Sequence, residues 1–505
     1  MTLLLPELFT AKTVRRGTAV AAAALALVLA GCADMGKVAS SAQLRDAAAL
    51  ELPAASTPDV QVAGQWWLAF GDNQLNALID QALQGNPSLQ VAQARLARAR
   101  ASADIAGAAD KPQLNASLDM MRQEFSNNYI YPPPLGGSIQ ETGTLQLNGS
   151  WEIDFFGKNR SALNAAIGTA NAAAADADAA RVLLTTNVAR GYLQWARLDD
   201  QLTVARRTLA QREETLRLVR DRVSAGLDTR LQLRQSESGI PEARQQIESI
   251  NEQIAIAQHA LDALVGKPNI TATLTSPELG NIKNIALQPV LPADLLGRRA
   301  DIAAARWRVE AATQDVKNAK SQFYPNVNLV AFAGFQSIGY DKLLRTSSQQ
   351  WGVGPAIRLP IFEGGKLRAN LRGKSADLDA AIESYNTTVL DAVRDVADSV
   401  TSVQSVARQQ TQQREAQDAA ESAYDIATQR YGAGLGNFLD VLSAETTVLL
   451  QRRQGVDLAA RALDAQVGLA RALGGGWQPS EETSTAALAA PPDQVTLLPP
   501  LQRAR

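Results

Sequence analysis

The stretch RVSAGLDTRL (Arg222–Leu231) returns as RYGAGLGNFL (Arg430–Leu439) in a chain of 505 residues. The two stretches share Arg, Ala, Gly and two Leu at matching positions. Two more blocks recur in the same order at nearly the same shift. The residues PQLN of 112–115 match PNVN of 325–328, and IDFFGK of 153–158 resembles LPIFEGGK of 359–366. Three ordered blocks indicate an internal repeat rather than chance similarity between alanine-rich helices.

Each half of the repeat is predicted to run as short helix, strand, loop, strand, long helix, turn, long helix. The strands are expected at 113–120, 144–154, 326–335 and 351–359. In the second of them, Leu145, Leu147 and Trp151 share one face, and polar residues from Gln146 to Asp154 share the other. Strands of about ten residues are long enough to cross a bilayer when tilted. The strands of the second half alternate less cleanly.

The helical segments are unusually long. No proline lies between Lys158 and Val223, or between Lys366 and Tyr431. Apolar residues recur every seven positions in both, and this spacing predicts left-handed packing against neighbouring helices. The heptad residues are Leu202, Leu209, Leu216 and Val223 in the first and Ile382, Val389, Val396 and Val403 in the second.

The N-terminus has the features of an export signal. Basic residues (Lys12, Arg15, Arg16) precede an apolar run at 18–30 that is too short to span a bilayer. The run ends in LAGC at 29–32, which looks like a bacterial lipobox. Lipidation of Cys32 is therefore expected, with an ordinary secretory signal and an incidental cysteine as the alternative.

The composition argues against several classes of function. Lys and Arg number 49 against 51 Asp and Glu, so nothing favours a nucleic-acid partner. The single His and single Cys allow neither a His/Cys metal cluster nor a disulfide within one chain. No phosphate-binding loop, nucleophile elbow or paired-acid motif is present. We therefore expect no enzyme activity, no cofactor and no metal.

Four strands cannot close a barrel, and an open edge in lipid leaves backbone groups without hydrogen bonds at a cost of several kcal/mol each. The strands must then close with copies of the same chain. Two chains give eight strands and three give twelve, and only the larger barrel leaves a passage. Glu152, Asp154 and Arg358 lie on or beside the polar strand faces and are predicted to line this lumen.

The motifs together resemble the TolC-like outer-membrane efflux factors, in the lipoprotein branch that serves resistance-nodulation-division pumps. The resemblance covers Cys32 to Trp477. It rests on the lipobox, QWW (65–67) with Phe70, NP (86–87), LPADLLGRRADI (291–302), FYP (323–325), LPIFEGG (359–365) and ALGGGW (472–477). The chain departs from the family at Ala300, where proline is usual; this loosens the start of the following helix slightly.

The resemblance implies an α+β membrane protein that forms a homotrimer in the outer membrane. Twelve strands would form a transmembrane β-barrel, continued by a long periplasmic α-helical barrel with a small equatorial domain. The implied partners are a periplasmic adaptor and an inner-membrane transporter of the resistance-nodulation-division class, with outer-membrane lipid around the barrel. The chain would act as a passive conduit for drugs or other small toxic compounds.

The expected domains follow from these assignments. They are a signal peptide (1–31), a lipid-anchored segment (32–70), helical-barrel parts (71–112, 291–325), β-hairpins (113–156, 326–362), helical hairpins (157–265, 363–473), an equatorial stretch (266–290) and a C-terminal equatorial tail (474–505).

The two helical turns are the predicted periplasmic tips. By resemblance, Leu439 and Asp440 lie where the family narrows its tunnel, and three Asp440 carboxylates would meet there. The alternative is that Asp440 only caps a helix, since Thr229 with Gln232 and Asn437 with Asp440 have capping-box spacing. The family's second acidic position falls on Ser443, which weakens the case for an acidic ring.

Four tip residues are candidates for adaptor docking: Gly226, Leu227, Gly434 and Leu435. Each Gly-Leu pair can also be read as a plain left-handed helix terminator followed by a packed leucine. Two other functions stay open from sequence. A periplasmic coiled-coil scaffold or adaptor lipoprotein would explain the heptads and the anchor, but not the four strands. A lipid-anchored hydrolase would need a catalytic set of residues that the sequence lacks.

Overall fold

A computed structural model describes residues 35–36, 38–45, 62–285 and 297–478. These residues form two compact units, each built from several separate stretches of the chain. The first unit contains the strands and the helical segments next to them in sequence, within 97–170 and 306–384. The second contains the helical hairpin ends and the surrounding short elements, within 44–96, 171–305 and 385–505. The signal segment, Cys32, the motif at 291–296 and the tail from 479 lie outside the described residues.

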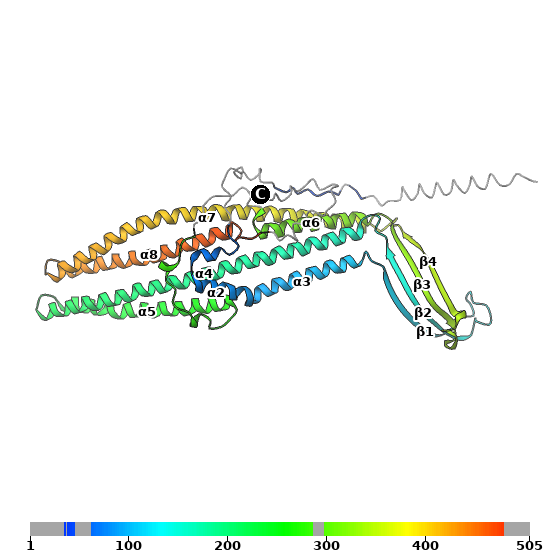
Figure 1. Ribbon diagram of the computed structural model, residues 1–505, viewed down its shortest axis with the longest axis horizontal. Helices are drawn as coiled ribbons and strands as arrows, with labels where there is room; N and C mark the ends of the chain where they lie inside the picture. The colour runs from blue at the N-terminus through cyan, green and yellow to red at the C-terminus, as the bar shows by residue number, and fades with distance from the viewer. Residues whose placement is uncertain (1–34, 37, 46–61, 286–296, 479–505) are drawn as a thin grey trace, which may run out of the picture. The chain divides into compact units, whose positions relative to one another are not determined.

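The first unit holds one antiparallel sheet of four strands in the order β1-β2-β3-β4 (Figure 1). The strands are β1 (Gln113–Glu124), β2 (Ile139–Glu152), β3 (Asn326–Ile338) and β4 (Gln349–Arg358). The four predicted strands are present, but each extends further toward its connecting loop than alternation indicated. The ladder pairs Glu124 with Ile139 and Thr142 with Ile338, so pairing continues past the apolar alternation.

The register gives the sheet two different faces, because residues directly opposite each other on neighbouring strands point to the same side. Leu118, Leu145 and Phe335 form one such row, and Leu114, Gly149 and Ala331 another. The apolar face comprises Leu114, Ala116, Leu118, Met120, Leu145, Leu147, Trp151, Leu329, Ala331, Ala333, Phe335, Trp351, Val353 and Ile357. This face matches the predicted alternation.

The opposite face is polar across β1 and β2 but mixed across β3. Asn115 and Asn148 share a row there with Phe332 and Gly352. A side chain at Gly352 would approach the Phe332 ring to 2.7 Å, so the glycine makes room for the ring across the strand pair. This pairing explains why alternation is less regular in the second half.

The helices repeat in the same order as the strands. The first half has α3 (Pro87–Ala108), α4 (Lys158–Ser224) and α5 (Arg230–Val265), and the second has α6 (Ala300–Ser321), α7 (Lys366–Gly432) and α8 (Phe438–Ala472). Both α4 and α7 are 67 residues long. The predicted element order of the repeat is thus confirmed. Among the described residues, no helix has both the length and the apolar character needed to cross a membrane.

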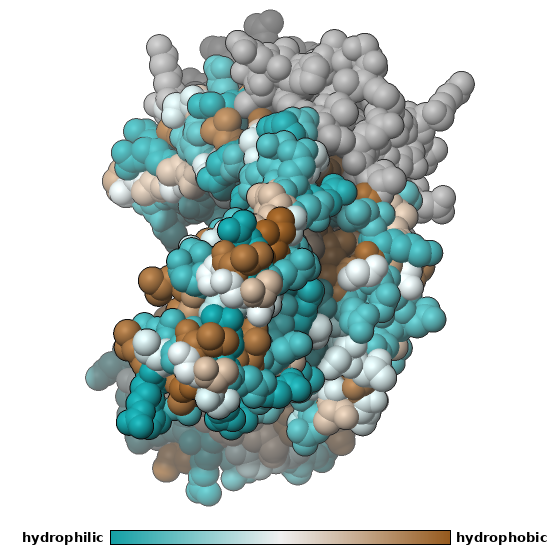
Figure 2. Space-filling model, turned by 90° about the vertical axis from the view of Figure 1, so that its left-hand side faces the viewer, coloured by the Kyte–Doolittle hydropathy of each residue, from teal (hydrophilic) through white to brown (hydrophobic). Residues whose placement is uncertain are grey.

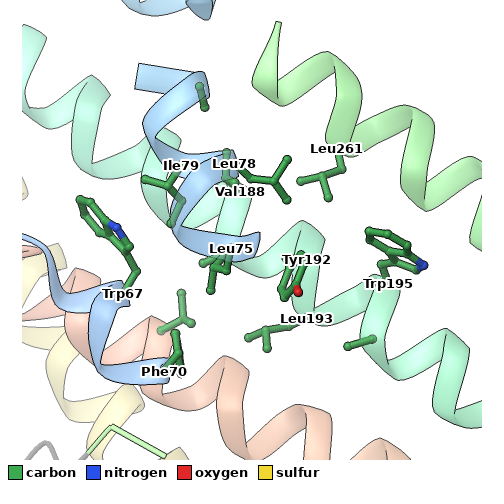
Figure 3. Close-up of a cluster of buried hydrophobic side chains, with 14 of the residues drawn as sticks. Trp67, Phe70, Leu75, Leu78, Ile79, Val188, Tyr192, Leu193, Trp195 and Leu261 are labelled. Atoms are coloured by element: carbon green, nitrogen blue, oxygen red, sulfur yellow. The ribbon is translucent and has the colours of Figure 1, made fainter. Parts of the chain in front are cut away.

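The second unit has its largest core around the short elements η2 (Trp66–Phe70) and α2 (Asn73–Gly85). Trp67, Phe70 and Leu75 pack with Tyr192 and Trp195 of α4 (Figure 3). Asp72 caps α2 by accepting from the amides of Gln74 and Leu75, and it also accepts a hydrogen bond from the Tyr192 hydroxyl. The QWW and Phe70 motif therefore anchors α2 on the long helix.

The heptad positions behave as the spacing predicts. Leu202 and Leu216 on α4 are buried, as are Val389 and Val396 on α7. Ion pairs add to this packing in the second unit: Arg212 on α4 binds Glu445 on α8 at 2.6 Å, between the hairpins, and Arg452 on α8 binds Glu421 on α7, within one hairpin. Arg452 is almost fully buried, so the contact contributes to specific helix pairing.

Candidate functional site

Both hairpin turns of the second unit have the same backbone. Gly226 and Gly434 adopt left-handed φ values of +74° and +75°. The amide of Leu227 donates to the carbonyl of Arg222 at 2.9 Å, and Leu435 donates to Arg430 at 2.8 Å. Each bond closes the C-terminal end of a helix at which the glycine adopts the left-handed conformation. A left-handed glycine ends the helix at both turns, but the packed leucine of that alternative is absent, because Leu227 and Leu435 are exposed. The docking role stays a prediction.

Apolar side chains are exposed at both turns. Leu227 and Leu435 are 66% and 71% exposed, and Leu231 and Leu439 are 67% and 65% exposed. Figure 2 views the unit from the hairpin-turn end and shows brown apolar surface gathered in clusters among polar residues. Contiguous apolar surface can mark a protein-binding site, whereas single exposed leucines are ordinary. The four docking candidates thus lie on two matching, neighbouring turns.

Asp440 has a defined local role in the single chain. Its amide donates to the Asn437 side chain at 3.0 Å, and its carboxylate accepts from the Asn437 amide at 3.3 Å. Thr229 and Gln232 form the corresponding box at the first turn. Both capping boxes predicted from spacing are therefore present. Asp440 and Leu439 are exposed, so the carboxylate stays available to a neighbouring chain.

A second network ties the two turns together and was missed from the sequence. Arg222 donates to Asp228 at 2.9 Å and to the Tyr431 carbonyl at 3.0 Å, and its guanidinium lies 4.6 Å from the Tyr431 ring centroid. The Tyr431 hydroxyl donates to Asp228 in turn. The repeat includes Arg222, but it does not include the partner of this arginine. Gly436 in the second half occupies the position that corresponds to Asp228 in the first.

The charge state of Asp228 follows from this setting. Burial opposes its ionisation, but hydrogen bonds from Arg222 and Tyr431 outweigh burial and lower the pKa of Asp228 below its usual value. A carboxyl group with a lowered pKa stabilises the folded state above its unfolded pKa, and this contribution disappears as pH falls through the lowered value. The network is thus fully formed at neutral pH.

Replacing Asp228 with alanine should loosen the first turn. The change removes a charge-assisted hydrogen bond from a side chain that is 5% exposed, an effect on the order of 1.5–3 kcal/mol. Hydrogen exchange at residues 222–230 should quicken in the variant. In the wild type, the protection of these amides relative to their intrinsic exchange rates should fall only as pH drops through the lowered pKa of Asp228. Asp221→Ala, at an exposed position in the last turn of α4, is the control; equal exchange in both variants would contradict the role of Asp228.

The three predicted lumen residues line one cavity of about 320 Å³ in the first unit. Glu152 pairs with Lys158 at 2.8 Å, and the Asp154 carboxylate accepts from the Arg160 amide at 2.8 Å. Arg358 has no ion-pair partner among the described residues. Asp154 thus caps α4, a role that the sequence analysis did not assign. The cavity combines these charged side chains with apolar ones such as Phe155 and Leu359. Within the described part of the chain, no group of His, Cys, Asp and Glu side chains could hold a metal.

The comparison with known families decides the identity of this architecture. A family model described as outer membrane efflux protein matches residues 78–267 and 291–475, more than half of the chain. The chain belongs to the outer membrane efflux protein family. The resemblance inferred from the motifs and the predicted fold class are both confirmed.

Curated relatives in this efflux family are similar along most of their length. The chain is 39% identical over 372 residues to the fusaric acid resistance protein FusA of Burkholderia cepacia, covering 72% of this chain and 70% of that protein. It is 34% identical over 476 residues to the multidrug resistance outer membrane protein MdtQ of Escherichia coli, covering 91% and 98%.

Solved structures of the efflux family share the fold. The outer membrane protein VceC of Vibrio cholerae superposes with a TM-score of 0.78 at 38% identity, covering 82% of this chain and 99% of that one. The outer-membrane channel OprN gives a TM-score of 0.77 at 28% identity, covering 88% and 99%. The chain is therefore an outer-membrane efflux protein with the channel fold.

Proposed function

We propose that three copies of this chain form a passive duct across the outer membrane, as the exit component of a tripartite efflux pump. Each copy contributes four strands to a twelve-stranded barrel, and the helical hairpins continue the duct into the periplasm. A periplasmic adaptor and an inner-membrane transporter of the resistance-nodulation-division class supply the substrate and the energy. The cargo is a small toxic compound, in line with relatives named for drug and fusaric acid resistance.

The single observation that carries this proposal is the two-faced sheet with unpaired edges. Among the described residues, β1 and β4 pair on one side only, and one face of the sheet is apolar except near the loop end, where it carries the Arg122–Glu141 pair. Lipid satisfies the apolar face but cannot hydrogen-bond an open strand edge. Pairing β4 of one copy with β1 of the next removes every edge, and twelve strands enclose a water-filled interior.

The exposed leucines at the two turns support the adaptor as partner. Leu227 and Leu435 protrude from rigid, glycine-terminated turns, so a partner gains apolar contact without first ordering a loop. Cys32 lies outside the described residues, and its acylation is proposed from the lipobox alone. The mass of the N-terminal peptide of the mature protein tests the acylation directly.

Asp440 is proposed to contribute to the narrowest part of the duct. Three carboxylates brought together by threefold symmetry attract cations and repel anions. Asp440→Asn removes the charge but keeps a side-chain oxygen for the cap, and we expect it to lower cation preference by several-fold in single-channel recordings. Asn437→Ala weakens the cap and keeps the charge. If Asn437→Ala changes ion preference as much as Asp440→Asn, Asp440 is only a cap.

Conductance in a planar bilayer tests the proposed duct. The purified lipoprotein should give discrete current steps of uniform size without nucleotide, adaptor or transporter. A periplasmic scaffold lipoprotein would bind membranes and give no steps. Absence of steps from protein with intact strands would reject the duct in favour of the scaffold.

A further inference from the structure

The residues that follow Cys32 form an extended strap on the first unit. The strap spans 35–43 and has neither helix nor strand among its described residues. Met35 and Val38 pack against an apolar cluster that includes Phe323 near the end of α6 and Leu371 in α7. This contact lies close to the sheet in sequence, because β3 begins three residues after Phe323.

One carboxylate holds the C-terminal part of the strap. The Asp379 side chain on α7 accepts hydrogen bonds from the Ser40 hydroxyl at 2.5 Å and from the Ser41 hydroxyl at 3.2 Å. It also accepts from the amides of Ser41 at 3.0 Å and Ala42 at 3.1 Å. Four donors from three consecutive residues therefore converge on one side chain. Bonds to an ionised acceptor are the stronger kind, so this contact is more than incidental packing.

A nearby carboxylate on the same helix provides a contrast. Asp377 is 67% exposed and lies 3.7 Å from Lys374, one turn away. A pair of this kind on a helix surface contributes little to stability. The hydrogen bonds from the strap therefore go to Asp379 and not to Asp377, two positions earlier on the same helix.

The strap also limits where the membrane anchor can lie. Cys32 precedes Met35 by three residues, and an extended chain covers at most about 3.6 Å per residue, so their Cα atoms are within about 11 Å of each other. Met35 contacts the end of α6, so the described start of the strap lies near the start of β3. A free N-terminal segment would impose no such limit.

We infer that Asp379 is a positioning residue that fastens the strap and thereby holds the acylated Cys32 beside the sheet. The inference rests on the proposed acylation of Cys32. Fixed in this way, the acyl chains enter the bilayer next to the barrel wall and do not trail on a loose tether. The strap thus couples lipid anchoring to the folded α6 and α7 segments of the same unit.

The test follows strap mobility in the full-length lipoprotein in its membrane. Ala39→Cys places a spin label on an exposed strap residue, and acylation of Cys32 leaves the new thiol as the only one to react. We expect an immobilised label in the parent protein and in Asp377→Ala, and a mobile label in Asp379→Ala. Trypsin cleavage after Arg45, just beyond the strap, should rise by about tenfold in Asp379→Ala alone, as expected when local opening becomes easier.

Two further measurements distinguish release of the strap from poor assembly of the Asp379→Ala variant and from loss of the duct. Ser40→Ala with Ser41→Ala removes two donors from the strap side and should give an intermediate mobility, even if Asp379→Ala assembles poorly. Uniform current steps from Asp379→Ala would show that the duct persists while the strap is released. A label as immobile in Asp379→Ala as in Asp377→Ala, with normal trypsin resistance, would overturn the inference.

Discussion

Replacing Gly474 with alanine is expected to cause severe loss of folded protein, with a destabilisation of about 3–5 kcal/mol. Gly474 has a φ of +99°, and an added Cβ would lie 1.9 Å from the carbonyl oxygen of Arg298. That atom belongs to the backbone and cannot rotate away. Left-handed backbone alone costs a residue with a side chain roughly 1–2 kcal/mol.

The position matters because Gly474 begins the turn that fastens α8 to α4. The amide of Gly475 donates to the Ala470 carbonyl at 2.8 Å, and the Trp477 indole donates to Asp178 on α4 at 2.8 Å. Gly280→Ala is the control, since that residue has no positive φ and an added Cβ meets nothing within 4 Å. Membrane yield and the temperature at which helical circular dichroism is lost are the measurements. Equal values for the two variants would contradict the expectation.

Asp301→Ala should give the second large effect, a loss of about 3 kcal/mol in the second unit. Arg299 is 9% exposed and donates to both Asp301 oxygens, at 3.0 and 2.7 Å. Its remaining contacts are the Ala472 carbonyl at 3.3 Å and Asp395 at 3.5 Å. Without Asp301 the guanidinium stays buried with its principal partner missing.

The contact between Arg299 and Asp301 also predicts how the stability of the second unit changes as pH falls. Burial opposes ionisation of Asp301, but the Arg299 hydrogen bonds and charge lower its pKa below the usual value. The stabilisation is therefore present at neutral pH and is lost only as pH falls through the lowered pKa. The control is Asp391→Ala, which breaks an exposed pair with Arg394 worth at most about 1 kcal/mol. Thermal midpoints that fall equally in both variants, or not at all, would show that the Arg299 contact is not needed.

Much of the fold could be predicted because its signals are local. A glycine that needs a left-handed φ marks the ends of both 67-residue helices, at Gly226 and Gly434. The two-residue period of a strand and the seven-residue period of packed helices can each be recognised within a short stretch of sequence. The repeat then multiplies these local signals, since each element is encountered twice. The family resemblance, resting on ordered motifs, led to the function that the comparisons support.

The contacts that the sequence did not reveal join residues far apart in the chain. Arg222 and Tyr431 are 209 positions apart, and Ser40 and Asp379 are 339 apart. No spacing rule connects such pairs, because their proximity depends on how distant parts of the chain pack. Strand ends were misjudged for a related reason: pairing with the neighbouring strand, rather than alternation within one, decides where a ladder stops.

The most direct measurement is the number of chains in the detergent-solubilised particle, determined by native mass spectrometry. We expect three chains, because a four-stranded sheet with two free edges is completed only by identical neighbours and twelve strands leave a passage. A stable single chain that stays soluble once detergent is removed would contradict it.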